Sequence, residues 1–168
     1  MSTVFVIDID GTICDSIDRV KEIWRIKENE PDAWTDDLMR EFLSEENLMN
    51  DSIVPGSEIV LELAKKCNAS PFFLTGRNDY AREPTRKWLT KIFKAPEETP
   101  LIMRPYDQKG VPTAQCKEGL FKKFLYSIYP NHTYIFFEDE DDTAKQYAKY
   151  GLVLRSPECW KHIEVPHD

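Results

Sequence analysis

Five short apolar segments are spaced along this chain, and each has the pattern of a buried strand. Within each segment apolar residues follow one another with little polar interruption, and β-branched and aromatic side chains are frequent. Such continuous runs are typical of parallel strands that are covered on both faces. The five predicted strands are Thr3–Ile9, Pro71–Thr75, Pro100–Met103, Thr133–Phe137 and Gly151–Leu154.

Between these segments apolar residues recur at the spacing of amphipathic helices. The predicted helices are Gly56–Cys67, Tyr80–Phe93, Ala114–Ile128 and Asp142–Tyr150. The alternation of strands and helices indicates an α/β fold, because parallel strands are joined by crossover helices. We therefore expect a Rossmann-like three-layer sandwich built on a five-stranded parallel sheet.

The segment from residue 16 to residue 50 interrupts this alternation. It contains two charged, Trp-containing stretches with helical patterns, Ile17–Glu28 and Asp32–Glu46, which are separated by Glu30-Pro31. An insertion directly after the first strand lies over the carboxyl edge of the sheet, where open α/β folds bind ligands. We interpret residues 16–50 as a small helical cap within a single domain that spans residues 1–168.

The composition is that of a globular protein with an acidic surface. Of the 168 residues 41% are hydrophobic and 31% are charged, and the formal net charge is −8. Because duplex binding needs a dense basic surface, this charge argues against a long duplex-binding footprint. Short or mononucleotide ligands remain compatible with it, since much of the acidity is concentrated between Glu28 and Asp51.

The cysteines and the N-terminal sequence indicate the cellular compartment in which the protein is expected. Cys14, Cys67, Cys116 and Cys159 are widely spaced and form no C-x-x-C pair, so neither a zinc ribbon nor a disulfide framework is indicated. No basic segment precedes a long apolar stretch, and no window approaches the roughly 18 apolar residues of a membrane span. The expectation is a cytoplasmic protein with no membrane partner.

Asp8 and Asp10 stand at the end of the first predicted strand, separated by one residue. Their side chains therefore start on the same face of the strand. Two carboxylates so close together favour a bound hard cation such as Mg²⁺, which prefers oxygen ligands. The alternative is a strand-ending turn in which Gly11 supplies the bend.

The sequence D-I-D-G-T-I after a hydrophobic strand resembles the opening motif of the haloacid dehalogenase-like phosphohydrolase superfamily. The resemblance implies that Asp8 attacks phosphorus and forms a phospho-aspartate. It also implies that Asp10 is the general acid for the leaving oxygen and then the general base for the attacking water.

Two further stretches resemble the second and third motifs of that superfamily. F-F-L-T-G-R carries Thr75 and Gly76, which by this resemblance hold phosphate oxygen atoms together with the backbone at Gly11. The third motif is a lysine at the start of the helix before the fourth strand. Lys117 fits it best, and Lys109 in the D-Q-K-G turn is the alternative; an exposed surface lysine is the other interpretation of either.

The acidic run after Thr133–Phe137 resembles the fourth motif, which supplies carboxylate oxygen to Mg²⁺. By the resemblance this ion is also held by Asp8 and by the backbone carbonyl of Asp10. Asp139 is the first choice as a ligand, Glu138 the second, and Asp142 a candidate for the outer shell. The superfamily usually has Gly-Asp or Asp-Asp at this point, so Glu138 departs from its pattern.

A narrower similarity covers Phe72–Thr143. T-G-R-N, R-E-P-T-R-K-W-L, L-I-M-R, C-K-E-G-L-F and E-D-E-D are similar to the 3'-phosphatase domain of phage-type polynucleotide kinases. This similarity implies that Arg77, Arg86 and Arg104 contact a nucleotide phosphate or base, although Arg86 also fits an ordinary surface charge. No phosphate-binding G-x-x-x-x-G-K-[ST] loop is present, which argues against kinase activity.

These patterns predict a Mg²⁺-dependent phosphomonoester hydrolase that acts on a nucleotide or a nucleic-acid 3'-phosphate end. Trp24, Trp34 and Tyr106 are candidates for stacking a base. The alternatives are a phosphatase for a small metabolite such as a sugar phosphate, and a non-catalytic interaction protein whose acidic Glu28–Asp51 segment binds a basic partner. The sequence leaves the oligomeric state open.

Overall fold

The structure is a computed structural model, and it describes residues 2–22 and 35–160. Trp24, Trp34 and the end of the predicted helix Ile17–Glu28 lie outside these residues. Within them no helix has the length and hydropathy that a membrane crossing requires.

Five parallel strands form the central sheet in the order β5-β4-β1-β6-β7, which confirms the predicted sheet. The strand order reverses at β1, which has β4 on one side and β6 on the other. In open α/β sheets ligands bind at the carboxyl end of such a reversal. The strands are β1 (Thr3–Ile7), β4 (Ala69–Asn78), β5 (Leu101–Arg104), β6 (Thr133–Phe137) and β7 (Gly151–Leu154).

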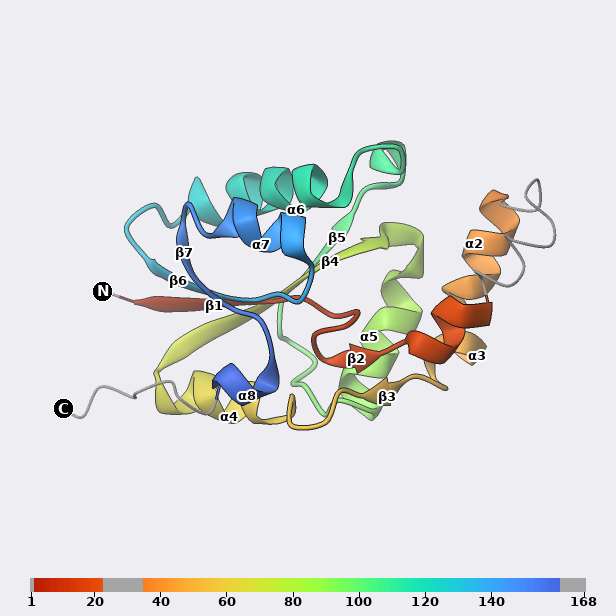
Figure 1. The fold of residues 1–168 in the computed structure, drawn as a ribbon, viewed down its shortest axis with the longest axis horizontal. Coiled ribbons are helices and arrows are strands. Elements are labelled where there is room, and N and C mark those ends of the chain that lie inside the picture. Colours follow the sequence, from red (N-terminus) through yellow and green to blue (C-terminus); the bar gives the residue numbers. More distant parts are fainter. Residues whose placement is uncertain (1, 23–34, 161–168) are drawn as a thin grey trace.

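Helices cover both faces of this sheet, as the three-layer prediction requires. Figure 1 shows α6 and α7 on one face and α4, α5 and α8 on the other. The predicted helix Ala114–Ile128 is divided, because a π-helical turn at Lys122–Tyr126 follows α6. The helices are α4 (Ile59–Lys66), α5 (Arg82–Lys91), α6 (Thr113–Phe121), α7 (Asp141–Tyr147) and α8 (Pro157–Trp160).

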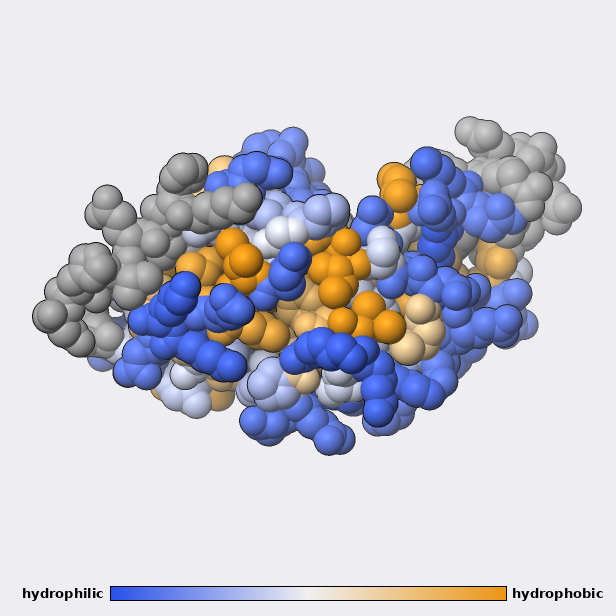
Figure 2. Space-filling view, turned by 90° about the horizontal axis from the view of Figure 1, so that it is seen from below, coloured by the Kyte–Doolittle hydropathy of each residue, from blue (hydrophilic) through white to orange (hydrophobic). Residues whose placement is uncertain are grey.

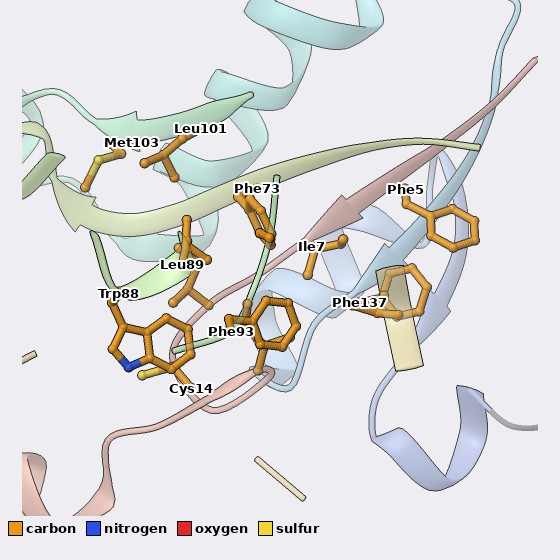
Figure 3. Packing of buried hydrophobic residues seen from close by; sticks show 14 of the residues in the cluster. Phe5, Ile7, Cys14, Phe73, Trp88, Leu89, Phe93, Leu101, Met103 and Phe137 are labelled. Atoms are coloured by element: carbon orange, nitrogen blue, oxygen red, sulfur yellow. The ribbon is translucent and has the colours of Figure 1, made fainter. Parts of the chain in front are cut away.

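Two apolar cores explain why the strands are continuous apolar runs. Phe5 and Ile7 of β1 belong to one core with Phe73 and Trp88, on the face of the sheet that α4, α5 and α8 cover, and Phe5 lies beside Phe137 (Figure 3). Val4 and Val6, which alternate with Phe5 and Ile7 along β1, belong to a second core on the opposite face, with Phe121 of α6 and Phe136 of β6. Each fully buried side chain of this size contributes roughly 1.5–3 kcal/mol. The two cores fix the sheet whose carboxyl edge carries the candidate site.

Most of the described part of the insertion is helical, and its two ends are joined by a short strand pair that the sequence did not predict. Residues 17–22 are helical, and α2 (Asp36–Phe42) and α3 (Glu45–Leu48) follow. Strand β2 (Cys14–Asp15) pairs antiparallel with β3 (Ser52–Ile53). In Figure 1 α2 and α3 lie beyond the carboxyl ends of the sheet strands.

The helix predicted over Asp32–Glu46 is two helices within the described residues. Thr35 accepts a hydrogen bond from the Leu38 amide and begins α2, whereas Ser44 accepts one from the Asn47 amide and begins α3. Hydroxyl caps of this kind start a new helix because they satisfy its free amide groups. The segment is charged throughout, so its pattern does not reveal that it forms two helices.

The face of the molecule that carries α4 and α8 is apolar in its middle and polar at its margins (Figure 2). A groove of about 760 Å³ runs along α4 and the start of β4, with Leu61, Phe72, Ile92 and Phe93 among its lining residues. The start of β4 is the amino edge of the sheet. This groove therefore lies at the opposite edge from the candidate site described next.

Candidate active site

Three buried charged groups meet where β1 ends. The Lys117 ammonium, on α6, lies 2.6 Å from Asp8 Oδ1 and 2.8 Å from Glu138 Oε2. All three residues are buried, although they come from distant parts of the chain. Of the two lysines that the sequence offered for this role, the structure brings Lys117 to Asp8. Lys109 instead forms an ion pair with Asp36 of α2 at 2.8 Å.

This triad holds two acids and only one base, and the pKa values reflect that imbalance. Burial and the neighbouring Glu138 charge raise the pKa of Asp8, although Lys117 acts in the opposite direction. Burial also raises the pKa of Glu138. For Lys117, burial lowers the pKa, but the charges of Asp8 and Glu138 outweigh it and raise the pKa above its ordinary value. A further cation beside Asp8 therefore favours its ionised form.

Asp139 and Thr12 complete the acidic side of the site. The Thr12 hydroxyl lies 3.3 Å from Asp8 Oδ2 and 3.0 Å from Asp139 Oδ1, and it accepts a hydrogen bond from the Asp139 amide at 3.2 Å. Gly11 has φ +82°, and a Cβ atom at this position would overlap the Asp139 carboxylate. The Asp-Gly-Thr sequence thus lets the Asp139 carboxylate lie directly against the backbone of the loop.

The donor set fits a hard divalent cation. Asp8, Glu138 and Asp139 each offer a carboxylate oxygen, and these atoms all lie within 4.8 Å of one another. Oxygen donors alone are the ligands that Mg²⁺ prefers. Both oxygens of Glu138 already accept hydrogen bonds, Oε2 from Lys117 and Oε1 from the Glu140 amide at 3.1 Å. This leaves Asp8 and Asp139 as the more available donors of the three.

Asp10 lies in a separate ion-pair network formed by two arginines. Arg77 binds it through two bonds, Nε to Oδ2 at 2.8 Å and Nη2 to Oδ1 at 2.7 Å, and Arg19 Nη2 lies 3.1 Å from Oδ1. Burial raises the pKa of Asp10, but Arg77 and then Arg19 outweigh this effect and lower the pKa to about 2. Arg77, which the sequence predicted to contact substrate, here fixes the carboxylate of Asp10.

Arg19 and Asp51 are residues of this network that the sequence did not indicate. Arg19 Nη2 lies 2.7 Å from Asp51 Oδ2 as well as beside Asp10, and Asp51 is buried. Arg19 belongs to the first helix of the insertion, and Asp51 lies between α3 and β3. Both lie in a charged segment whose pattern does not distinguish buried from exposed charges. The insertion is thus tied to Asp10 by a half-buried ion pair, and to Asp51 by a more deeply buried one.

Cys14 contacts the same network, and its chemistry yields a prediction. Burial raises the pKa of the Cys14 thiol, and burial likewise raises that of Cys116. A thiol that stays protonated and buried does not react with electrophiles. In the native protein we expect DTNB to modify exposed Cys159 rapidly and half-buried Cys67 more slowly.

Under the same conditions Cys14 and Cys116 are expected to react only after unfolding. The measurement is the time course of thiol release, with the fast phase assigned by its loss in Cys159→Ser. Four thiols that react together at the fast rate, before unfolding, would contradict the buried positions of these two cysteines.

One cavity of about 360 Å³ gathers most of the predicted site residues. Its lining includes Asp8, Asp10, Thr75, Gly76, Arg77, Lys117 and Asp139. Thr75 is buried, and its hydroxyl accepts a hydrogen bond from the Arg77 amide at 3.2 Å. The lining from the insertion is apolar at Val20, Met39, Phe42 and Leu43 and polar at Ser16 and Arg19. We call this space the site cavity.

Two predicted substrate arginines are not brought to the site cavity. Arg86 donates to the Thr99 carbonyl at 2.7 Å, ahead of β5 and thus at the amino edge of the sheet. Arg104 is buried and donates to the Val111 carbonyl at 3.1 Å and to the Thr113 hydroxyl at 2.8 Å, so it fixes the loop that leads into α6. Asp142 lies on the surface beside Lys145.

Comparison with solved structures bears on the fold. The chain is similar to one chain of a Pnkp1/Rnl/Hen1 complex, with a TM-score of 0.65 and 18% identity over 92% of this chain and 45% of that one. A chain of a Pnkp1/Rnl/Hen1 RNA repair complex gives a TM-score of 0.64, with 18% identity over 92% of this chain and 42% of that one. This chain thus spans less than half the length of either.

A hydrolase from Pseudomonas syringae gives a TM-score of 0.49 and 14% identity over 97% of this chain and 100% of that one. No protein-family model and no curated protein sequence matches the chain. At these identities the likeness is one of fold. The likeness to the two complexes, together with the parallel five-stranded sheet, confirms the fold class that the sequence predicted.

Proposed function

We propose, for a chain that has the haloacid dehalogenase-like fold, that the site cavity hydrolyses phosphate monoesters through a covalent aspartyl phosphate on Asp8. The observation that carries this proposal is the Lys117 ammonium 2.6 Å from the buried Asp8 carboxylate, with Asp10 and Asp139 lining the same cavity. A carboxylate at a strand end beside a fixed cation is suited to attack phosphorus, because the cation offsets the negative charge of the incoming phosphate.

The reaction has two steps. In the first, an Asp8 oxygen bonds to phosphorus, the ester P–O bond breaks, and Asp10 gives a proton to the leaving alkoxide. In the second, Asp10 takes a proton from water, whose oxygen attacks phosphorus and frees Asp8 and inorganic phosphate. With a pKa of about 2 beside Arg77 and Arg19, Asp10 is ionised at neutral pH. The observed arrangement therefore suits the second step, and the first requires Asp10 to carry a proton.

The other groups of the cavity act on the phosphate oxygens. The Thr75 hydroxyl and the Gly76 backbone are donors at the end of β4, and Lys117 supplies a positive charge. A Cβ at Gly76 would lie 3.2 Å from the Thr113 methyl group, so a larger residue would crowd the start of α6. Donors that are fixed before the reaction stabilise charge without having to reorganise.

We propose that Mg²⁺ is the cofactor and that Asp8 and Asp139 hold it, with the Asp10 carbonyl as a further donor. Bound there, Mg²⁺ supplies electrostatic neutralisation of the phosphoryl group. Glu138, whose oxygens bind Lys117 and the Glu140 amide, orients the lysine in this proposal instead of binding the metal directly.

The substrate that we propose is a nucleotide or a nucleic-acid 3'-phosphate end. The site cavity has an apolar part of its lining, Val20, Met39, Phe42 and Leu43, which suits a nucleobase better than a sugar, whose hydroxyl groups need polar partners. The fold likeness to one chain of an RNA repair complex supports the same class. A basic-partner interaction protein would not need the buried Asp8–Lys117 pair.

The test is a substrate panel with purified protein. We expect release of inorganic phosphate from a 3'-phosphorylated oligonucleotide or a mononucleotide to require Mg²⁺, to stop with EDTA, and to recover when Mg²⁺ is added in excess. Sugar phosphates, measured in parallel, should be turned over more slowly. Absence of phosphate release from every nucleotide substrate under these conditions would reject the proposed substrate class.

A further inference from the structure

Two tyrosines occupy equivalent positions after neighbouring strands at the carboxyl edge of the sheet. The pairing of β4 with β5 places Asn78 opposite Arg104, and Tyr80 and Tyr106 each follow two residues later. Asn78 lines the site cavity. Two residues span at most about 7 Å, so the Tyr80 backbone lies within that distance of a cavity residue.

The two rings form one cluster with a cation from the insertion. Their centroids are 6.0 Å apart at an angle of 65°. The Arg40 guanidinium, on α2, lies 4.5 Å from the Tyr80 centroid and 5.6 Å from that of Tyr106. Lys109 places its ammonium 4.9 Å from the Tyr106 centroid. The rim beside the site cavity thus combines aromatic rings with positive charge.

Exposure suggests that this cluster faces a ligand. Tyr106 is 38% exposed. Arg40 and Lys109 are the cations of the cluster, and Asp36 pairs with Lys109 and accepts a hydrogen bond from Tyr106.

We propose that Tyr106, Tyr80 and Arg40 form a nucleobase-stacking subsite for the nucleotide next to the phosphorylated end. This inference rests on the proposed function and narrows its substrate to a short single strand. Aromatic rings and guanidinium planes are the groups on which unpaired bases stack, with little dependence on sequence. Lys109 sits at the edge of the cluster, where the phosphate between two nucleotides would meet its charge.

The alternative is a purely structural role, in which the cluster only holds α2 against the core. The two roles differ in their dependence on substrate length. Loss of a stacking subsite changes KM only for substrates with a second nucleotide, whereas loss of a structural contact changes KM for every substrate that enters the site cavity. Matched substrates therefore distinguish them.

The experiment compares KM for a 3'-phosphorylated pentanucleotide with KM for a nucleoside 3'-monophosphate. In Tyr106→Ala we expect KM for the pentanucleotide to rise about tenfold, since stacking of one base contributes roughly 1–3 kcal/mol, and KM for the mononucleotide to stay unchanged. Tyr106→Phe should keep the wild-type values. The control is Tyr129→Ala, because Tyr129 is equally exposed, at 37%, but follows the far end of α6.

Three results would overturn the subsite: an equal rise in KM for both substrates, no rise for either, or the same rise in Tyr129→Ala. The subsite can also be tested without turnover. In the Asp8→Asn background, the affinity for a labelled unphosphorylated pentanucleotide, measured by fluorescence anisotropy, should fall about tenfold on Tyr106→Ala. Equal binding by the two proteins would reject the subsite even if phosphatase activity is present, and a difference would support it even if activity is absent.

Discussion

Replacing Asp8 with Asn is expected to lower turnover of the best phosphate ester by at least about 10⁴-fold, a loss typical of removing a nucleophile. An amide oxygen does not form the aspartyl phosphate, although it preserves the shape of the side chain and still accepts a hydrogen bond from Lys117. The measurement is kcat by phosphate release in the presence of Mg²⁺. A trapping experiment should also find labelled phosphate on acid-quenched wild-type protein and none on the variant.

The control is Glu97→Gln, which removes a carboxylate of the same charge from the exposed loop before β5. It should leave kcat within about twofold of the wild type, because Glu97 lies at the opposite edge of the sheet. Retention of more than a few per cent of activity in Asp8→Asn would place the nucleophile elsewhere. Circular dichroism of both variants separates this outcome from misfolding.

Lys117→Met is expected to cost both activity and stability. Met fills a similar volume but leaves Asp8 and Glu138 buried without their cation. Breaking a buried ion pair from one side typically costs about 3–5 kcal/mol. For a chain of this size each kcal/mol lowers Tm by roughly 2–4 °C, so a drop of about 10 °C is expected in EDTA, measured by thermal unfolding.

The loss of stability in Lys117→Met should depend on pH, in a direction that follows from the raised pKa values of Asp8 and Glu138. When a carboxyl group has a higher pKa in the folded than in the unfolded state, the folded state binds the extra proton, so stability falls as pH rises. Lys117→Met should therefore be closest to the wild type in mildly acidic solution and furthest from it at higher pH.

The double variant Lys117→Met/Glu138→Gln supplies the control, since it removes one of the two unpaired acids. Its Tm should recover part of the loss, because only the Asp8 charge then lacks a partner. A single variant as stable as the wild type at neutral pH, or a double variant less stable than the single one, would contradict the buried triad as the source of the effect.

The sheet was predictable from the sequence because its strands are buried on both faces. Phe5 and Ile7 pack on one face and Val4 and Val6 on the other, so the apolar run marks the strand directly. The same argument placed Asp8 and Asp139 at one edge, since they follow adjacent parallel strands, β1 and β6. Residues that directly follow buried parallel strands can thus be assigned to one edge of the sheet from the sequence.

The ion-pair network around Asp10 was not predictable, because a charged residue has the same letter whether it is buried or solvated. Arg19 and Asp51 stand among many exposed charges of the insertion, and only the fold joins them. Arg86 and Arg104 illustrate the converse. Both were assigned to substrate on local similarity, yet their guanidinium groups bind carbonyl groups of the chain.

Asp10 accepts hydrogen bonds from two parts of the molecule, Arg77 of β4 and Arg19 of the insertion. If the insertion swings outward, Arg19 leaves with it and one positive charge is withdrawn from this carboxylate, so its proton affinity rises. Admission of a substrate and readiness to protonate a leaving group would then be a single event. Such coupling would keep the acid form of Asp10 rare as long as Arg19 stays beside it.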